Sequence, residues 1–339
     1  MSSHSAIIFP DDSAGPLVSA IDSATKSLRI KMFVFTDPAL LKAVTGARYR
    51  SVKVQVMLNP ARRDGEDDNG STRAQLIEAG IEVNDTNPAF GLTHEKSLVV
   101  DDEMAFIGSL NWETENLTET RDYVICTSRP HEVDEMIKCF DADWHRIPFL
   151  PGKHTHLVWC PINGRERIAR FIDDAKHTLF VQNQRYQDPI VIERLVRAKE
   201  RGVKVHVLAR PPHTLKKDKL MEGVGGLRIM DDVGIKVHKL KNLKLHGMML
   251  LADGLRAING SINLAPGSFD DRRELAIETR DDDVVERLHK AAHHDWEHSH
   301  PLDLTDDGLL SDLEERSEES AKRLVLSSQQ QVRTEANNQ

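Results

Sequence analysis

The sequence predicts an α/β protein built from two tandem repeats, each an α/β/α sandwich with a mixed sheet, related by a pseudo-twofold axis and sharing one site. Two observations predict this fold. Segments rich in β-branched and aromatic residues, such as SLRIKMFVF at 27–35 and VKVQVML at 52–58, alternate with helical patterns. The same succession of segments then occurs a second time, with matching residues 151 or 152 positions further on.

The internal repeat covers nearly all of residues 16–300. Seven residues of the first copy recur 152 positions later: His94, Asp101, Gly108, Ser109, Asn111, Arg121 and Trp144 as His246, Asp253, Gly260, Ser261, Asn263, Arg273 and Trp296. Six upstream residues recur 151 positions later: Ile21, Asp22, Ala24, Leu28, Asp37 and Pro38 as Ile172, Asp173, Ala175, Leu179, Asp188 and Pro189. The chain therefore divides into a first repeat at 1–152, a second at 153–303 and a polar tail at 304–339.

Each repeat is expected to open with a helix, at 16–27 and 165–177, because apolar residues recur there with helical spacing. A strand follows at 27–35 and 178–186, then a helix at about 38–47 and 189–201, and an alternating strand at 52–58 and 203–209. A third helix near 70–79 ends at Gly80, a residue that suits a helix end. A short strand (IEV, IKV), the strand opened by the histidine (KSLVVD, MMLLAD), two further strands and a long helix ending near the tryptophan complete each repeat.

Composition limits the classes of protein to which the chain can belong. A hydrophobic fraction of 39% with 29% charged residues is typical of an ordinary globular protein. The net charge of −9 argues against a broadly basic nucleic-acid coat, although it allows a local basic groove. The start of the chain has no basic stretch before a long apolar run, and no run of about 18 apolar residues occurs, so we expect neither a signal peptide nor a membrane-spanning helix. A cytoplasmic location is expected, with peripheral contact to a membrane allowed, and Cys126, Cys139 and Cys160 are expected to be reduced, packed thiols.

His94, Lys96 and Asn111 form the first candidate site. On a strand, His94 and Lys96 would point to the same face because side chains alternate. Asn111 ends the neighbouring strand after Gly108 and Ser109, which are small enough to let a ligand approach the backbone. An imidazole, an ammonium and an amide on one patch suit an anion such as a phosphate. The second copy offers His246, Ser261 and Asn263 in the same relation.

Two such patches facing each other would make one site with two histidines. Phosphodiester cleavage through a covalent intermediate needs one neutral imidazole to attack phosphorus and one protonated imidazole to give a proton to the leaving alcohol. Asp122 and Glu274 each lie eleven residues after their asparagine and are expected to accept a hydrogen bond from a histidine ring; a plain salt bridge is the alternative. Cationic and amide donors would stabilise the charge, so no metal ion and no cofactor is expected.

The pattern HxKxxxxD followed by GSxN, present twice, resembles the phospholipase D superfamily and its HKD motif. The first copy matches at His94, Lys96, Asp101, Gly108, Ser109 and Asn111, and the second at His246, Asp253, Gly260, Ser261 and Asn263. The resemblance implies a covalent phosphohistidine intermediate, with His94 as nucleophile and His246 as acid. It also implies a structural role for Asp101 and Asp253, and a site that one chain can complete, so that a monomer is permitted.

Met248 departs from the pattern, since the family would have a lysine there. Methionine has a similar length, so the departure removes a phosphate-binding charge rather than volume. Loss of such a donor typically costs about 10²–10³ in rate. A divergent enzyme with one lysine, a phosphodiester-binding pseudoenzyme and an engineered inactive variant are the three explanations.

The leading functional hypothesis is a phosphodiesterase that hydrolyses or transfers the phosphatidyl group of a phospholipid, as cardiolipin synthase-like members do. A metal-independent nuclease of the same superfamily and an inactive phosphodiester-binding protein are the alternatives.

Several other features have a structural interpretation. His293, His294, His298 and His300 are interpreted as a solvated helix end, and Trp112 either packs in the core or stacks on a substrate. Arg62, Arg63 and the basic run 210–219 either line the mouth of the site or form ordinary surface. One amphipathic helix, at 309–324, is expected in the tail.

Overall fold

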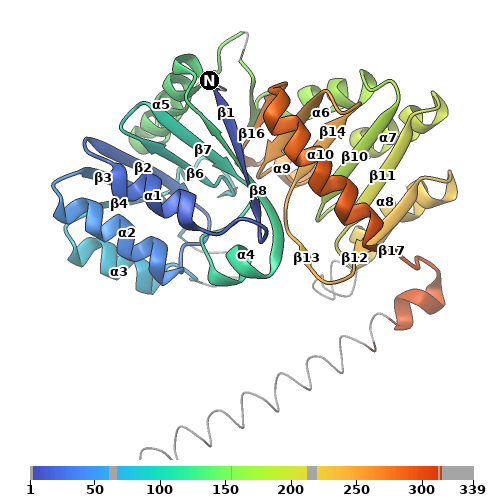
Figure 1. Ribbon diagram of the computed structural model, residues 1–339, viewed down its shortest axis with the longest axis horizontal. Coiled ribbons are helices and arrows are strands. Elements are labelled where there is room, and N and C mark those ends of the chain that lie inside the picture. Colours follow the sequence, from blue (N-terminus) through green and yellow to red (C-terminus); the bar gives the residue numbers. More distant parts are fainter. Residues whose placement is uncertain (1–2, 61–66, 154, 212–219, 312–313, 315–339) are drawn as a thin grey trace, which may run out of the picture.

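The computed structural model describes residues 3–60, 67–153, 155–211, 220–311 and 314. Within these ranges the chain forms two α/β repeats that lie side by side, with β8 and β16 near the centre (Figure 1). Arg62, Arg63 and most of the basic run 210–219 lie outside the described residues, as does most of the helix expected at 309–324. None of the described helices is both long enough and apolar enough to cross a bilayer.

The first repeat contributes eight strands and five helices to the described structure. They are β1 (His4–Phe9), α1 (Gly15–Ser23), β2 (Ser27–Met32), α2 (Pro38–Tyr49), β3 (Lys53–Leu58), α3 (Gly70–Glu78), β4 (Glu82–Asp85), β5 (Leu92–Thr93), β6 (Ser97–Val100), β7 (Met104–Gly108), α4 (Thr114–Thr118), β8 (Thr120–Thr127) and α5 (Pro130–His145). Its sheet has the order β1-β8-β7-β6-β2-β3-β4. The sheet is mixed, because β2, β3 and β4 are parallel whereas β6, β7, β8 and β1 pair antiparallel.

The second repeat follows the same plan. Its elements are β9 (Leu157–Cys160), α6 (Gly164–Asp173), β10 (Thr178–Asn183), α7 (Pro189–Glu200), β11 (Lys204–Ala209), α8 (Leu220–Asp232), β12 (Lys236–Leu240), β13 (Lys244–Leu245), β14 (Met249–Ala252), β15 (Arg256–Gly260), α9 (Pro266–Asp270), β16 (Arg272–Thr279), α10 (Asp282–Glu297) and β17 (Ser299–Pro301). The sheet has the order β17-β12-β11-β10-β14-β15-β16, with β9 also paired to β16. The predicted α/β fold with tandem repeats and mixed sheets is thus confirmed.

The opening helix of each repeat is shorter than the sequence indicated. Instead of 16–27 and 165–177, α1 and α6 end at Ser23 and Asp173. In the first repeat the carboxylate of Asp101 accepts hydrogen bonds from the backbone N–H groups of Thr25, Lys26 and Ser27, at 2.7–3.2 Å. Asp253 does the same for residues 176–178 at 2.7–2.9 Å. These aspartates therefore hold the turn before β2 and β10, and Asp101 and Asp253 adopt positive φ angles of 55° and 57° to do so.

The two repeats are joined by a shared hydrophobic cluster and by buried ion pairs. The cluster includes Ile125 and Ile107 from the first repeat with Leu251 and Ile277 from the second. At its edges, Arg121 contacts Asp295 at 2.8 Å, and the symmetry-related pair Arg273–Asp143 has a distance of 3.1 Å. Each pair links a strand of one repeat to the long helix of the other. The repeats are therefore held in one fixed orientation.

Candidate active site

Two very short strands cross from one repeat to the other and position the histidines. β5 pairs parallel with β16, and the following backbone N–H of His94 donates to the carbonyl of Arg273 at 2.9 Å. β13 pairs parallel with β8 in the same way, and His246 donates to the carbonyl of Arg121 at 3.3 Å. Each histidine thus lies against a strand of the opposite repeat.

This exchange corrects one expectation. His94 and Lys96 are not in one continuous strand, because the segment 94–96 connects β5 to β6. Strand alternation therefore does not place the two side chains on one face. Instead, Nζ of Lys96 donates a hydrogen bond to the carbonyl oxygen of His94 at 2.7 Å.

The histidines are paired crosswise with carboxylates. Nδ1 of His94 lies 3.1 Å from Oε2 of Glu274, and Nδ1 of His246 lies 2.9 Å from Oδ1 and 3.1 Å from Oδ2 of Asp122. Both carboxylate side chains are fully buried, whereas both imidazoles keep 15% of their surface exposed. Each histidine is therefore held by the opposite repeat and keeps one edge open.

The tautomer of His94 follows from a second contact. Its Nδ1 also lies 3.0 Å from the carbonyl oxygen of Ser261, which can only accept a hydrogen bond. Nδ1 must therefore carry the proton, and Nε2 of the neutral ring carries the lone pair. Burial and the charge of Lys96 lower the pKa of His94 to about 4, although Glu274 opposes part of the shift. His94 is thus neutral at pH 7.

Lys96 is the buried cation of the site, with 2% of its surface exposed. Burial lowers its pKa to about 7, while the carboxylates of Glu274 and Asp122 both act to raise it. Nζ also lies 5.1 Å from the ring centroid of Phe33, which contacts His94 edge-on with 4.9 Å between ring centroids. The ammonium of Lys96 is therefore close enough to interact with both carboxylates that pair with the histidines.

Comparison with known proteins identifies the family of the chain. The family described as "Cardiolipin synthase, PLD-like domain" matches the chain twice, at residues 17–144 and 168–296. The chain belongs to the phospholipase D superfamily. The human mitochondrial cardiolipin hydrolase is 35% identical over 142 residues, which cover 41% of this chain and 53% of the human protein.

Two longer similarities cover both repeats. Cardiolipin synthase B of Salmonella typhi is 22% identical over 302 residues, covering 74% of this chain and 70% of the synthase. The crystal structure of the phosphatidylserine synthase of Haemophilus influenzae Rd KW20 superposes with a TM-score of 0.68 at 12% identity, covering 94% of each chain. The similarity to that structure concerns the fold alone.

Met248, the departure from the phospholipase D motif, is buried in the apolar cluster of the second repeat, with 5% of its surface exposed. The contact that Lys96 makes with the carbonyl of His94 is made by a different residue in the second repeat. Nε2 of Gln184 donates to the carbonyl oxygen of His246 at 3.2 Å, as Lys96 does to His94. Gln184 corresponds to Phe33 at the 151-residue offset. In the first repeat the apolar residue is Phe33 and the polar residue is Lys96. In the second repeat the corresponding positions have a polar residue, Gln184, and an apolar residue, Met248.

Arg272 is a second cation that the sequence analysis missed. Its counterpart in the first repeat, Thr120, donates to Oδ2 of Asp122 at 2.5 Å. Nη1 of Arg272 lies 3.9 Å from Oε1 of Glu274, and its buried Nε has no hydrogen-bond partner among the described residues. Lining up the two repeats would have revealed both Gln184 and Arg272 as sites of asymmetry.

The motif serines and glycines support the scaffold. Oγ of Ser109 donates to Oδ1 of Asp122 at 2.6 Å, and Oγ of Ser261 bonds to the backbone of Leu275. A Cβ on Gly260 would lie 2.2 Å from the carbonyl oxygen of Leu275. The missing Cβ of Gly260 therefore accommodates the neighbouring strand. Gly108 is similarly confined, with a Cβ at 3.2 Å from two apolar side chains.

The motif asparagines differ between the repeats. Nδ2 of Asn111 donates to Oε2 of Glu113 at 2.8 Å, and the second repeat has Ala265 at the position of Glu113. The Oδ1 atoms of Asn111 and Asn263 are buried without a hydrogen-bond partner among the described residues. Trp112 packs edge-on against Phe35 with 3% exposure, so it belongs to the core.

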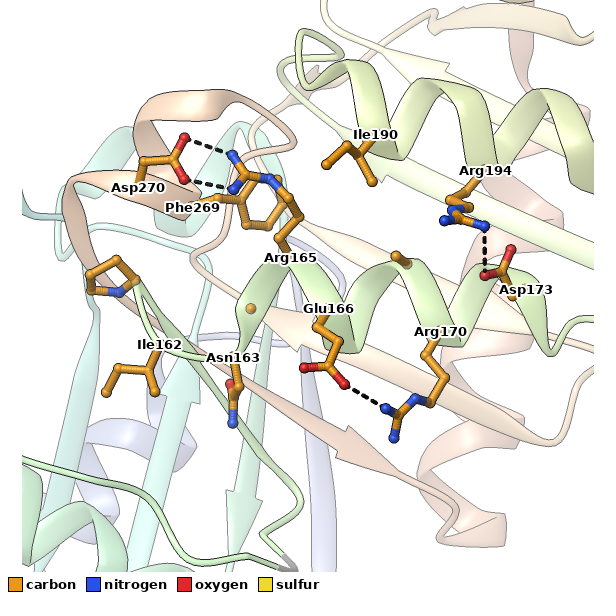
Figure 2. A pocket seen from close by; sticks show the side chains of 13 residues that line it. Ile162, Asn163, Arg165, Glu166, Arg170, Asp173, Ile190, Arg194, Phe269 and Asp270 are labelled. Atoms are coloured by element: carbon orange, nitrogen blue, oxygen red, sulfur yellow. Dashed lines mark hydrogen bonds and ion pairs between the residues drawn. The ribbon is translucent and has the colours of Figure 1, made fainter.

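Two other polar regions lie outside this site. A hollow of about 560 Å³ between α6, α7 and α9 is lined by Arg165, whose guanidinium is paired with Asp270 (Figure 2). The same guanidinium also lies 3.0 Å from Asp188. The charge of Arg165 is therefore already balanced by these two aspartates. On α10, His293 is 55% exposed and lies 3.7 Å from Glu297, in keeping with a solvated helix end.

Proposed function

We propose that the chain is a phosphodiesterase that hydrolyses or transfers the phosphatidyl group of a phospholipid through a phosphohistidine intermediate. The observation that carries this proposal is the crosswise pairing of His94 with Glu274 and of His246 with Asp122. It provides two oriented imidazoles, of which His94 is neutral with its lone pair on Nε2. Membership in the phospholipase D superfamily supports the same chemistry.

In the first step, Nε2 of His94 attacks phosphorus, a P–N bond forms and the ester P–O bond breaks. His246 donates its proton to the leaving oxygen, which departs as an alcohol. The positive charge that develops on the ring of His94 is stabilised by Glu274, whose pKa is lowered despite burial by its contacts with His94.

In the second step, the neutral His246 removes a proton from water or from an acceptor alcohol. The oxygen attacks phosphorus, the P–N bond breaks, and His94 returns to its neutral form. Water gives hydrolysis and an alcohol gives transfer, so the two reactions differ only in the second nucleophile.

The phosphate oxygens are bound by the ammonium of Lys96 and the guanidinium of Arg272. Both cations are buried, with 2% and 9% of their surfaces exposed, and in such surroundings a preorganised charge is worth more than in water. Arg272 thus replaces the positive charge that Met248 lacks, and Gln184 replaces the contact that a lysine would make with the backbone of His246. A divergent enzyme is therefore favoured over an inactive phosphodiester-binding protein.

A phospholipid substrate is supported by the matched family and by the relatives, which are described as a cardiolipin hydrolase and a cardiolipin synthase. The test uses vesicles of phosphatidylglycerol, phosphatidylcholine or cardiolipin, alongside single-stranded and double-stranded DNA, all in EDTA. We expect release or exchange of a lipid headgroup by the native chain and its loss in His94→Ala. Cleavage of DNA but of no lipid would assign the nuclease function instead, and turnover of neither would contradict an enzymatic role.

A further inference from the structure

A second cluster of ionisable side chains lies at the junction of the repeats and shares no residue with the active site. His131 and Glu132 belong to the first turn of α5, and His156 directly precedes β9. One oxygen of Glu132, Oε1, lies 3.2 Å from Nδ1 of His156 and 3.7 Å from Nε2 of His131. The three ligand atoms all lie within 4.8 Å of one another.

The two distances from Glu132 are near the spacing that a small divalent cation requires. Zinc binds imidazole nitrogen and carboxylate oxygen at about 2.0–2.2 Å in tetrahedral geometry, so its ligand atoms lie about 3.4 Å apart. The two distances from Glu132 are close to that value. The side chains of His131 and His156 are 61% and 49% exposed, which leaves both rings room to turn toward a bound ion.

The carboxylate is also oriented from behind. Its other oxygen, Oε2, accepts hydrogen bonds from Nε2 of His4 at 2.7 Å and from Oγ1 of Thr127 at 2.5 Å. Nδ1 of His4 lies 2.8 Å from Oγ1 of Thr279 in β16. Such outer contacts fix a metal ligand in place, and here they keep Oε1 directed at the two exposed imidazoles. The side chain of Glu132 is fully buried, so these contacts hold it in one position.

We propose that Nε2 of His131, Oε1 of Glu132 and Nδ1 of His156 bind a divalent transition-metal ion of the zinc type, with water completing the coordination. His131 and Glu132 belong to the first repeat, whereas His156 and the supporting Thr279 belong to the second. The bound ion ties α5 to the chain entering β9 and stabilises the junction of the repeats.

One neighbouring cation opposes the metal. Nη1 of Arg129 lies 3.5 Å from the same Oε1 of Glu132, and its side chain is 29% exposed. Metal binding must displace this guanidinium toward solvent. Arg129→Ala is therefore expected to bind the ion more tightly than the native chain, an effect that a merely structural role of the histidines does not produce.

The test is zinc binding to the full chain after treatment with EDTA and desalting, measured by calorimetry at pH 7.5. We expect one high-affinity ion per chain, a loss of at least tenfold in affinity in His131→Ala and in His156→Ala, and a gain in Arg129→Ala. Zinc should also raise the Tm of the native chain and not that of His131→Ala. Since His131 is mostly exposed, its replacement should leave the fold of the chain intact.

His293→Ala is the matched control, because His289 and His293 lie close together on α10 and could chelate zinc by themselves, with 5.3 Å between ring centroids. Unchanged affinity in His293→Ala supports the proposed site. The proposal is overturned if His131→Ala and His156→Ala bind zinc as the native chain does, or if His293→Ala alone abolishes binding.

Discussion

His94 and Glu274 belong to opposite repeats, yet Nδ1 of the histidine lies 3.1 Å from Oε2 of the glutamate. His246 and Asp122 form the inverse pair. Neither repeat alone contains a supported histidine, so the site depends on both. The proposed chemistry can be tested at each of these contacts.

The two carboxylates are expected to contribute unequally. Nδ1 of His94 has a second acceptor in the carbonyl of Ser261, whereas the described contacts of Nδ1 of His246 are with Asp122 alone. We therefore expect Asp122→Asn to reduce kcat by about 10²-fold or more, and Glu274→Gln to have a smaller effect. Steady-state kinetics on one lipid substrate compare the two isosteric variants directly. Equal losses would contradict the role assigned to the Ser261 carbonyl.

Lys96 should set the alkaline limit of substrate capture. Its pKa is lowered to about 7, so its ammonium is present below that pH and is lost as the pH rises through it. We expect kcat/KM to fall above about pH 7 on a p-nitrophenyl phosphodiester, whose leaving group needs no acid. Lys96→Arg keeps its charge at high pH and should remove this limb. A limb that persists unchanged in Lys96→Arg would assign it to another group.

Arg272 is expected to act on substrate and on Lys96. Arg272→Thr restores the residue of the first repeat and should lower kcat/KM by about 10-fold to 10²-fold. Because the charge of Arg272 lowers the pKa of Lys96, the same variant should move the alkaline limb to higher pH. A thermal unfolding scan serves as the control for folding. Loss of activity without this pH shift would indicate a structural role only.

Met248 and Gln184 are expected to behave as a coupled pair. Met248→Lys alone places an ammonium in an apolar cluster, while the carbonyl of His246 is already bonded to the amide of Gln184. It should reduce the free energy of unfolding by about 1–3 kcal/mol. The double variant Gln184→Phe with Met248→Lys recreates the pair Phe33 and Lys96 and should recover stability. Denaturant unfolding of both single variants and the double variant measures the interaction free energy between the two positions. If the two changes in unfolding free energy simply add, the positions are not a coupled pair.

The residues of the site were predictable because the repeat carries them in each copy. The offset of 152 residues relates His94 to His246 and Asp122 to Glu274. It therefore also predicted that the site has two imidazoles. The crosswise pairing was not predictable from local pattern. β5 and β13 have two residues each, too few for a periodic signal, and they pair with strands 120 to 180 residues away along the chain.

The functions of small polar residues also depended on tertiary contacts. Ser109 was expected to let a ligand approach the backbone, and tertiary contacts add that its hydroxyl donates a hydrogen bond to Asp122. The ends of α1 and α6 were predicted too far along the chain. The carboxylates of Asp101 and Asp253 hold the turn that follows each helix, and they lie more than 70 residues away in sequence. The sequence pattern favoured a longer helix in both places.

The central claim is that His94 attacks phosphorus and His246 supplies the proton. It is tested most directly in His246→Ala with a p-nitrophenyl phosphodiester, because this leaving group departs without an acid while resolution still needs a base. Rapid quenching at neutral or alkaline pH followed by peptide mass spectrometry should find the phosphoryl adduct on His94. An adduct elsewhere, or a burst of p-nitrophenol without any adduct, would contradict the mechanism.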